Sequence, residues 1–200
     1  MSPPVPVLSL VLADEHRLFR AGLARLLSVR GISVVGETDS GARCLELVQS
    51  LQPSLLLISL SLNDQCGLEV VHSVRQHTPR LPILALTPNW SQLTYHTVMR
   101  AGASAMISKE NDPHQLLEAI QAVVLQPAPV VPRRRQDRYI SLRQMRILRG
   151  LTRGQTNEEI ATGLNYSRST IKAELRELFA SFETLDRNQL ITSAARHGLV

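Results

Sequence analysis

The sequence predicts an α/β domain built on a parallel sheet, followed by a smaller domain made only of helices. Three observations support this fold class. Over residues 1–125, short apolar runs alternate five times with segments in which apolar residues recur at helical spacing. A proline-rich stretch then interrupts both patterns. The residues beyond it show helical spacing alone.

The apolar runs predict five strands. They are Val7–Ala13, Ile32–Gly36, Leu55–Leu60, Pro82–Thr87 and Ala105–Ser108, the last being weak by composition. Strands that alternate with helices pair in parallel, and their crossovers are right-handed. We therefore expect a doubly wound sheet of five strands with helices on both faces.

Apolar stripes between these runs predict the helices. The stripes are Leu18, Leu23, Leu26 and Leu27; Leu45, Val48 and Leu51; Val70, Val71 and Val74; Leu93, Val98 and Met99; and Leu116, Leu117, Ile120 and Val123. Ser40 and Asp112 each precede a stripe. Both are expected N-caps, because a short polar side chain can accept from the free amides of a first helical turn.

Residues 126–138 predict a linker between a domain of residues 1–125 and a domain of residues 139–200. Pro127, Pro129 and Pro132 each remove a backbone donor and fix φ, so neither a helix nor a central strand fits. Arg133 to Arg135 either touch a polyanion or remain solvated.

The second domain is expected to hold four short helices. Their markers are Ile140, Ile147, Leu148 and Leu151; a capping box from Thr156 to Glu159; the cap Ser167 with Ile171, Leu175, Leu178, Phe179 and Phe182 on the buried side; and Gln189, Leu190 and Ile191. Gly163 to Tyr166 form a tight connection between the second and third helices, which predicts a helix-turn-helix.

The basic residues are concentrated in the last third of the chain. Residues 1–132 hold 9 Lys and Arg against 10 Asp and Glu, whereas residues 133–200 hold 13 against 7. The whole positive excess therefore lies beyond residue 132. A compact basic segment favours a polyanionic partner, usually nucleic acid, although a merely soluble basic surface is the alternative.

Composition argues against several other classes of protein. No apolar run approaches the roughly 20 residues of a membrane span, and the first residues lack the pattern of a secretory signal. Cys44 and Cys66 form no Cys-x-x-Cys pair, so neither a disulfide scaffold nor a zinc site is expected. We expect a cytoplasmic protein with no membrane partner.

The third helix of the second domain begins with hydroxyl residues and cations. A recognition helix meets the DNA groove at this end, where free amides and the helix dipole favour phosphate. Arg168, Lys172 and Arg176 can reach phosphates or guanine edges. An ordinary capped surface helix is the alternative.

A longer pattern runs through the same domain. It comprises Ile140 to Gln144, Ile147 and Leu148, Gly154, Thr156 to Ala161, Leu164, Ser167, and Thr170 to Lys172. This pattern resembles the LuxR/NarL-type four-helix DNA-binding domain. The resemblance implies that Lys172 contacts double-stranded DNA with Arg168 and Thr170 nearby, and that the fourth helix, around Leu190 to Ala195, can serve in a homodimer. We expect the DNA-binding residues to be Arg168, Ser169, Thr170, Lys172 and Arg176.

One position departs from that family. Glu174 stands where the family often has His, and Glu177 follows on the same helix. Carboxylates near a phosphate backbone repel it. Glu174 therefore weakens non-specific binding, accepts from a cytosine amine, or points away from DNA.

The first domain carries a second resemblance. Asp14 and Glu15 follow the first strand, Thr87 ends the fourth, Ala101 to Ser104 precede the fifth, and Lys109 ends it. This pattern resembles the receiver domain of response regulators and implies a flavodoxin-like fold. Ligand chemistry in such a sheet lies at the carboxyl ends of the strands. The candidate pocket there comprises Asp14, Glu15, Ser59, Thr87 and Lys109.

Ser59 stands where a working receiver has the aspartate that accepts the phosphoryl group. A serine hydroxyl is a poor nucleophile without a base, and it brings no charge to a cation site. We expect Lys109 to pair with Asp14 or Glu15 instead. The loop of residues 62–67 lacks the family's Pro-Gly, and Met106 occupies its aromatic switch position. These departures predict a receiver without an aspartyl-phosphate switch, or one that has drifted to a purely structural role.

Two nearby residues offer other chemistry. Asp64 can replace the missing phosphoryl acceptor only if the backbone directs its side chain into the pocket, and we do not expect this. Cys66 senses oxidants only if a nearby cation lowers its pKa, and no basic residue lies beside it in the sequence, so an inert thiol is expected.

The resulting hypothesis is a DNA-binding transcription regulator that is not an enzyme and needs neither cofactor nor metal. Its receiver-like domain sets the oligomeric state or receives a protein or small-molecule signal. Two alternatives stand beside it. One is a regulator phosphorylated on Ser59 by a serine kinase. The other is an interaction protein that sequesters a partner regulator and barely binds DNA, which Glu174 and Glu177 would suit.

Overall fold

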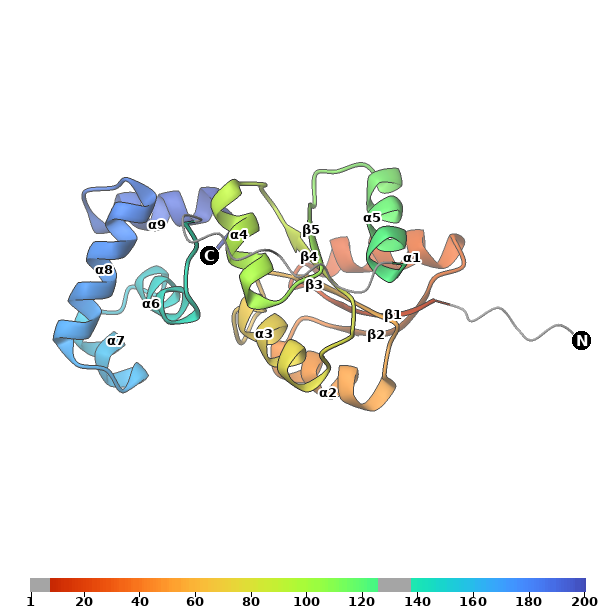
Figure 1. Ribbon diagram of the computed structural model, residues 1–200, viewed down its shortest axis with the longest axis horizontal. Coiled ribbons are helices and arrows are strands. Elements are labelled where there is room, and N and C mark those ends of the chain that lie inside the picture. The colour runs from red at the N-terminus through yellow and green to blue at the C-terminus, as the bar shows by residue number, and fades with distance from the viewer. Residues whose placement is uncertain (1–7, 126–137) are drawn as a thin grey trace, which may run out of the picture.

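The computed structural model describes residues 8–125 and 138–200, which contain one five-stranded sheet and nine helices (Figure 1). The strands are β1 (Ser9–Ala13), β2 (Ser33–Thr38), β3 (Leu55–Ser59), β4 (Ile83–Thr87) and β5 (Ala105–Ser108). The helices are α1 (Arg17–Val29), α2 (Gly41–Leu51), α3 (Gly67–His77), α4 (Gln92–Ala101), α5 (Pro113–Leu125), α6 (Leu142–Thr152), α7 (Asn157–Leu164), α8 (Arg168–Phe182) and α9 (Arg187–Arg196).

The sheet is doubly wound, as the sequence predicts. Its order is β2-β1-β3-β4-β5 and every neighbouring pair is parallel. Because side chains alternate across a strand, Leu10 and Leu12 pack with α1 and α5, whereas Val11 and Ala13 pack with α2, α3 and α4. From β1 the chain adds β2 on one side of the sheet, and it then adds β3, β4 and β5 on the other side. The boundary between β1 and β3 is therefore a topological switch point, which lies at the carboxyl ends of these strands.

The second strand extends beyond its apolar run. The sequence predicts Ile32–Gly36, but β2 spans Ser33–Thr38, so its end was placed too early. Glu37 pairs with Leu12 and Thr38 with Ala13 in the ladder with β1. Backbone pairing, which the hydropathy pattern does not report, carries the strand through these two polar residues.

The predicted helix caps are confirmed. The Ser40 hydroxyl accepts from the Arg43 amide at 3.2 Å. Asp112 Oδ1 accepts from the amides of His114 and Gln115 at 2.8 and 3.0 Å. Thr156 opens α7 with a complete capping box.

The second domain contains the predicted helix-turn-helix. Helix α7 ends at Leu164, and its C-cap residue Asn165 adopts a left-handed conformation with φ of 56°. Asn is one of the few residues that tolerate this conformation. Tyr166 then donates its amide to the Ala161 carbonyl at 2.9 Å, and Ser167 caps α8. Ile171, Leu175, Leu178 and Phe182 are buried, as predicted, and Phe179 is partly buried against the same cluster.

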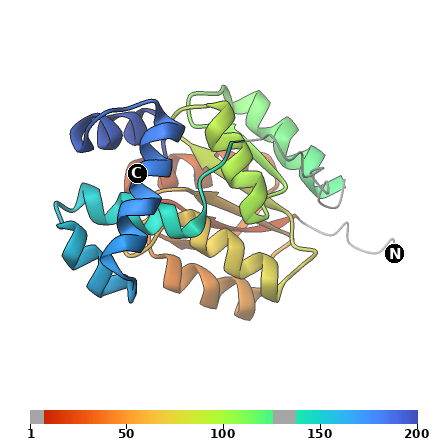
Figure 2. The ribbon, with the colours of Figure 1, turned by 60° about the vertical axis from the view of Figure 1, so that its left-hand side comes forward.

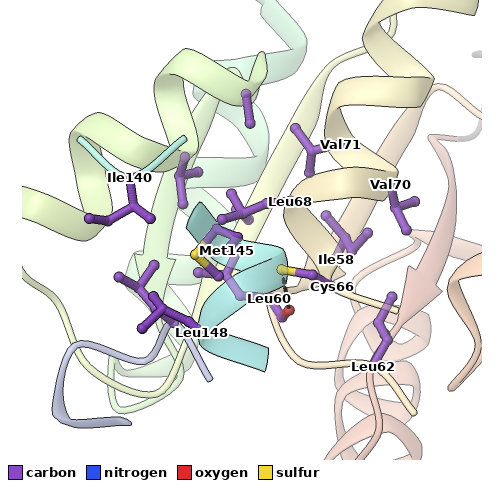
Figure 3. Close-up of a cluster of buried hydrophobic side chains, with 14 of the residues drawn as sticks. Ile58, Leu60, Leu62, Cys66, Leu68, Val70, Val71, Ile140, Met145 and Leu148 are labelled. Atoms are coloured by element: carbon purple, nitrogen blue, oxygen red, sulfur yellow. Dashed lines mark hydrogen bonds between the residues drawn. The ribbon is translucent and has the colours of Figure 1, made fainter. Parts of the chain in front are cut away.

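Ile140 does not belong to α6, contrary to the sequence prediction. Ser141 caps the helix, so Ile140 precedes it and its side chain is buried. Ile140 directly precedes the N-cap. An apolar residue at this position commonly packs against the fourth residue of the helix, which is Met145. Both side chains join the same buried cluster (Figure 3). Local periodicity could not show this use of Ile140.

The two domains pack against each other along a contact that we call the seam. Met145 and Leu148 of α6 enter a buried cluster with Leu60, Cys66 and Leu68 of the first domain (Figure 3). Figure 2 shows α6 lying beside α3 and α4. One continuous apolar core therefore crosses the domain boundary.

Polar contacts reinforce the seam. Ile140 donates its amide to Thr97 Oγ1 at 2.9 Å, and Thr94 Oγ1 donates to the His197 carbonyl at 2.6 Å. Arg146 of α6 forms an ion pair with Glu69 of α3. The predicted linker lies outside the described residues except for Arg138, and so do Arg133 to Arg135. Among the described helices, none is long and apolar enough to cross a membrane.

Candidate functional site

The first candidate site is the outer face of α8. Arg168, Lys172 and Arg176 recur at every fourth position and so lie on one side of the helix. All three are exposed, although the two domains are packed together. The seam therefore leaves this cationic face open.

Neighbouring residues hold the start of α8 in place. Arg168 forms an ion pair with Glu158 of α7, and both side chains are largely exposed. The hydroxyls of Ser169 and Thr170 lie 2.7 and 2.8 Å from the Ser167 hydroxyl. An exposed ion pair contributes only about 0.2–1 kcal/mol, so Arg168 can exchange Glu158 for another anion at little cost.

The second candidate site lies at the carboxyl edge of the sheet. Asp14 follows β1 and is fully buried, and its Oδ2 atom lies 2.6 Å from Nζ of Lys109, which follows β5. The His16 amide donates to Asp14 Oδ1 at 2.9 Å. Of the two partners that the sequence offers Lys109, the structure selects Asp14.

The other three predicted pocket residues lie at the same edge. Ser59 ends β3, is fully buried, and accepts from the Ser61 amide at 3.3 Å. Thr87 ends β4, and its hydroxyl donates to the Asn89 carbonyl at 2.8 Å. The side chain of Glu15 is about one-third exposed, at 32%. The strand ends thus gather all five residues, but only Asp14 and Lys109 pair.

Comparison with known proteins identifies both domains. Residues 10–121 match the response regulator receiver domain family, and residues 139–194 match the luxR family of bacterial regulatory proteins. The first match covers more than half of the chain. The chain belongs to the response regulators. Its C-terminal part is a luxR-type helix-turn-helix domain, so the protein is a DNA-binding transcription regulator of the two-component class.

The relatives span nearly the whole regulator. Response regulator protein VraR of Staphylococcus aureus is 27% identical over 206 residues, covering 96% of this chain and 99% of the relative. VraR of Staphylococcus saprophyticus is 28% identical over 210 residues, covering 98% and 99%. Among solved structures, an RcsB–DNA complex superimposes with a TM-score of 0.75 at 22% identity, covering 93% of this chain and 97% of RcsB. RcsB of Salmonella enterica serovar Typhimurium bound to the rprA promoter gives 0.73 at 20% identity, covering 94% and 98%.

The two carboxylates that the sequence places on α8 of the regulator face its own α6. Glu174 Oε1 lies 3.1 Å from Arg143 Nη1, and its side chain is only 14% exposed. This contact raises the pKa of Arg143. Glu177 accepts from Gln144 Nε2 at 3.0 Å. Of the three alternatives for Glu174, the structure supports the one in which it points away from the cationic face.

Sequence reasoning missed a contact between the pocket and the end of α9. Gly198 packs so tightly on the loop after β4 that an added Cβ would lie 2.6 Å from Thr87 Oγ1 and 3.1 Å from Pro88 Cδ. The φ of Gly198 is 65°, which also favours glycine. No periodic signal reports such a contact, because it joins positions far apart in the chain.

Asp64 points away from the pocket, as expected. It accepts from the amides of Gly41 and Ala42 at 2.6 and 3.1 Å and from the Ser40 hydroxyl at 2.8 Å, at the start of α2. Partial burial opposes ionisation, but these hydrogen bonds outweigh it and lower the pKa of Asp64 to about 2. Burial raises the pKa of the Cys66 thiol to about 11, which supports the expected inert thiol.

Replacing Asp64 by alanine is expected to lower the free energy of unfolding by about 1 kcal/mol at pH 7, because the first turn of α2 loses its acceptor. The pKa of Asp64 is depressed in the folded state, so its contribution is present above about pH 4 and is lost as the pH falls toward 2. Urea unfolding at several pH values measures the difference. Asn63→Ala, an exposed neighbour, is the control. A difference independent of pH between 6 and 2.5 would contradict this role.

Proposed function

We propose that this response regulator controls transcription by binding double-stranded DNA through α8 as a homodimer, and that it does so without an aspartyl phosphate. It needs no cofactor for this activity and is not an enzyme. The receiver domain would instead receive a protein or small-molecule signal. We also propose the predicted boundaries, with domains of residues 1–125 and 139–200.

The observation that carries this proposal is the buried ion pair of Asp14 and Lys109 beside Ser59. A receiver that takes a phosphoryl group needs an ionised acceptor and carboxylates free to hold Mg²⁺. Here Ser59 brings no charge, and Lys109 already neutralises Asp14. Glu15 alone remains, so the donor set does not fit Mg²⁺. Among the described residues, no three His, Cys, Asp or Glu side chains gather where they could hold a metal ion.

The open cationic face of α8 supports DNA binding. Arg168 and Lys172 lie in its first turns, where a recognition helix enters the major groove. Arg176 lies one turn further along and can reach the phosphate backbone. The RcsB structures that share this fold are described as bound to DNA.

A homodimer formed through α9 would have to use the exposed side of that helix. RcsB is described as two dimers on two parallel DNAs. In this regulator Leu190 and Ala194 are fully buried in the core of their own domain, so they are not free for a partner. Thr192, Ala195 and Arg196 are exposed on the same helix. A dimer contact through α9 would therefore use Thr192, Ala195 and Arg196 in place of Leu190 and Ala194, which the range suggested by the sequence includes.

Neither alternative gains support from the structure. A serine kinase would need access to the Ser59 hydroxyl, which is fully buried. The sequestering alternative rests on Glu174 and Glu177, and both contact α6. A DNA-binding regulator independent of phosphorylation remains the better account.

Mass spectrometry of the intact chain tests phosphate independence. After incubation with acetyl phosphate and Mg²⁺, we expect no added phosphoryl mass, because Ser59 stands at the acceptor position and Lys109 already holds Asp14. A regulator known to accept phosphate is the positive control. Protein isolated from cells is measured in parallel, which covers kinases as well. A stoichiometric adduct on any residue of either sample would contradict the proposal.

A further inference from the structure

A cavity of about 270 Å³ lies in the seam, outside the carboxyl ends of β1 and β3. Open α/β sheets bind their ligands at this switch point. The receiver domain contributes Glu15 and the loop after β3, and the end of α6 forms the opposite wall. The cavity is separate from the Asp14 and Lys109 pair, neither of which lines it.

The α6 wall is strongly cationic. Arg149 and Arg153 both line the cavity. Arg149 is partly committed, since its Nη2 donates to the carbonyls of Leu62 and Asn63 at 3.2 and 3.4 Å. Arg153 is exposed, and within the described part of the chain its guanidinium takes no hydrogen bond or ion pair. Among the described residues, the cavity therefore presents one uncommitted guanidinium, and Glu15 and Val200 also line it.

The lining of the cavity combines apolar and polar residues. Leu60, Cys66 and Met145 line it, and Figure 3 shows the three side chains converging where α6 meets the loop after β3. Leu199, which follows α9, lines it as well. Ser61 and Asn63 add polar groups at the receiver side. Apolar side chains beside polar groups and a cation suit a small molecule with one charged end and one apolar end.

We propose that this cavity binds a small organic anion, with its carboxylate or phosphate group on Arg153 and Arg149 and a short apolar body over Leu60 and Met145. The inference rests on the proposed function, because such a ligand would supply the signal that an aspartyl phosphate does not. A volume of 270 Å³ limits the ligand to roughly the size of a substituted benzene ring.

A bound anion would link the two domains. It contacts α6 on one side and the loop after β3 on the other, so it binds only while the seam is closed. A ligand that binds one arrangement alone shifts the population toward it in proportion to occupancy. The ligand thus controls how freely the helix-turn-helix domain separates from the receiver.

Calorimetric titration of the full chain with phenyl phosphate and with benzoate tests the proposal. We expect saturable binding of at least one probe, with a dissociation constant on the order of 1 mM or tighter for a ligand this small. Inorganic phosphate, which lacks the apolar body, should bind more weakly. Binding of phenyl phosphate alone would point to a phosphate monoester, and binding of benzoate alone to a carboxylate.

Two variants give effects of opposite sign. Arg153→Leu should weaken binding at least about tenfold, since it removes a charge-assisted hydrogen bond. Glu15→Gln should tighten binding, because it removes a negative charge from the wall. Arg80→Leu, an exposed arginine remote from the cavity, is the matched control and should leave binding unchanged. Circular dichroism establishes that each variant is folded.

Two results would overturn the anion site. One is that neither probe shows saturable binding at probe concentrations up to 50-fold above about 1 mM. The other is equal weakening by Arg153→Leu and Arg80→Leu, which would show general surface attraction. DNA binding and phosphoryl adducts are measured separately, so loss of the anion site leaves the proposed function standing. A phosphoryl adduct found together with intact anion binding would contradict the proposed function and leave the anion site standing.

Discussion

Replacing Arg168 and Lys172 together by alanine is expected to weaken binding to a natural target fragment about 100-fold or more. Each cation removed from a phosphate or base edge loses a charge-assisted contact, and a specific base contact is worth about 1–3 kcal/mol. Arg168 loses only an exposed pair with Glu158 in the free protein, so the fold is expected to remain intact. Fluorescence anisotropy on fragments recovered by genome-wide mapping of bound sites measures the affinity.

The salt dependence adds an independent readout for this variant. If both side chains neutralise phosphates, the slope of log affinity against log salt falls by about 2. Arg30→Ala with Arg80→Ala removes the same charge from exposed sites of the receiver domain and should change neither affinity nor slope appreciably. Full affinity in the Arg168 and Lys172 variant would end the assignment of α8 as the DNA-reading helix.

Replacing Lys109 by methionine is expected to lower the free energy of unfolding by about 3 kcal/mol. Asp14 is fully buried, and among the described residues Lys109 Nζ, at 2.6 Å, is its only cationic side-chain partner apart from the exposed His16 ring. Breaking a buried pair on one side leaves an uncompensated charge, which typically costs about 3–5 kcal/mol. Urea unfolding monitored by circular dichroism measures the loss.

The double variant Asp14→Asn with Lys109→Met is the matched control. It removes both charges, so it should recover most of the stability that the single variant loses. The contact of Lys109 with the Phe19 ring, at 4.9 Å, is absent from both variants and so cancels in the comparison. A single variant that loses less than about 1 kcal/mol would mean that the pair does not neutralise the pocket.

The sequence by itself determined the fold class and the order of the elements in the described residues, because these depend on local signals. A period of two or of 3.6 residues specifies the element type and its buried side. Cap chemistry acts within a few residues, so Ser40, Asp112, Thr156 and Ser167 could be recognised without the fold. The helical period also predicted which face of α8 is exposed. The carboxyl-edge position of the pocket followed from the topology of a parallel sheet.

Only the tertiary structure decided which partner each charged or apolar side chain meets. Lys109 could pair with Asp14 or Glu15, and Glu174 could face DNA or point away from it; the sequence left both open. Packing settled them through contacts between residues far apart in the chain. No pattern in the sequence predicted the seam at Met145 or the cavity between α6 and the loop after β3. Periodicity states which face of an element is buried, but it does not state against what.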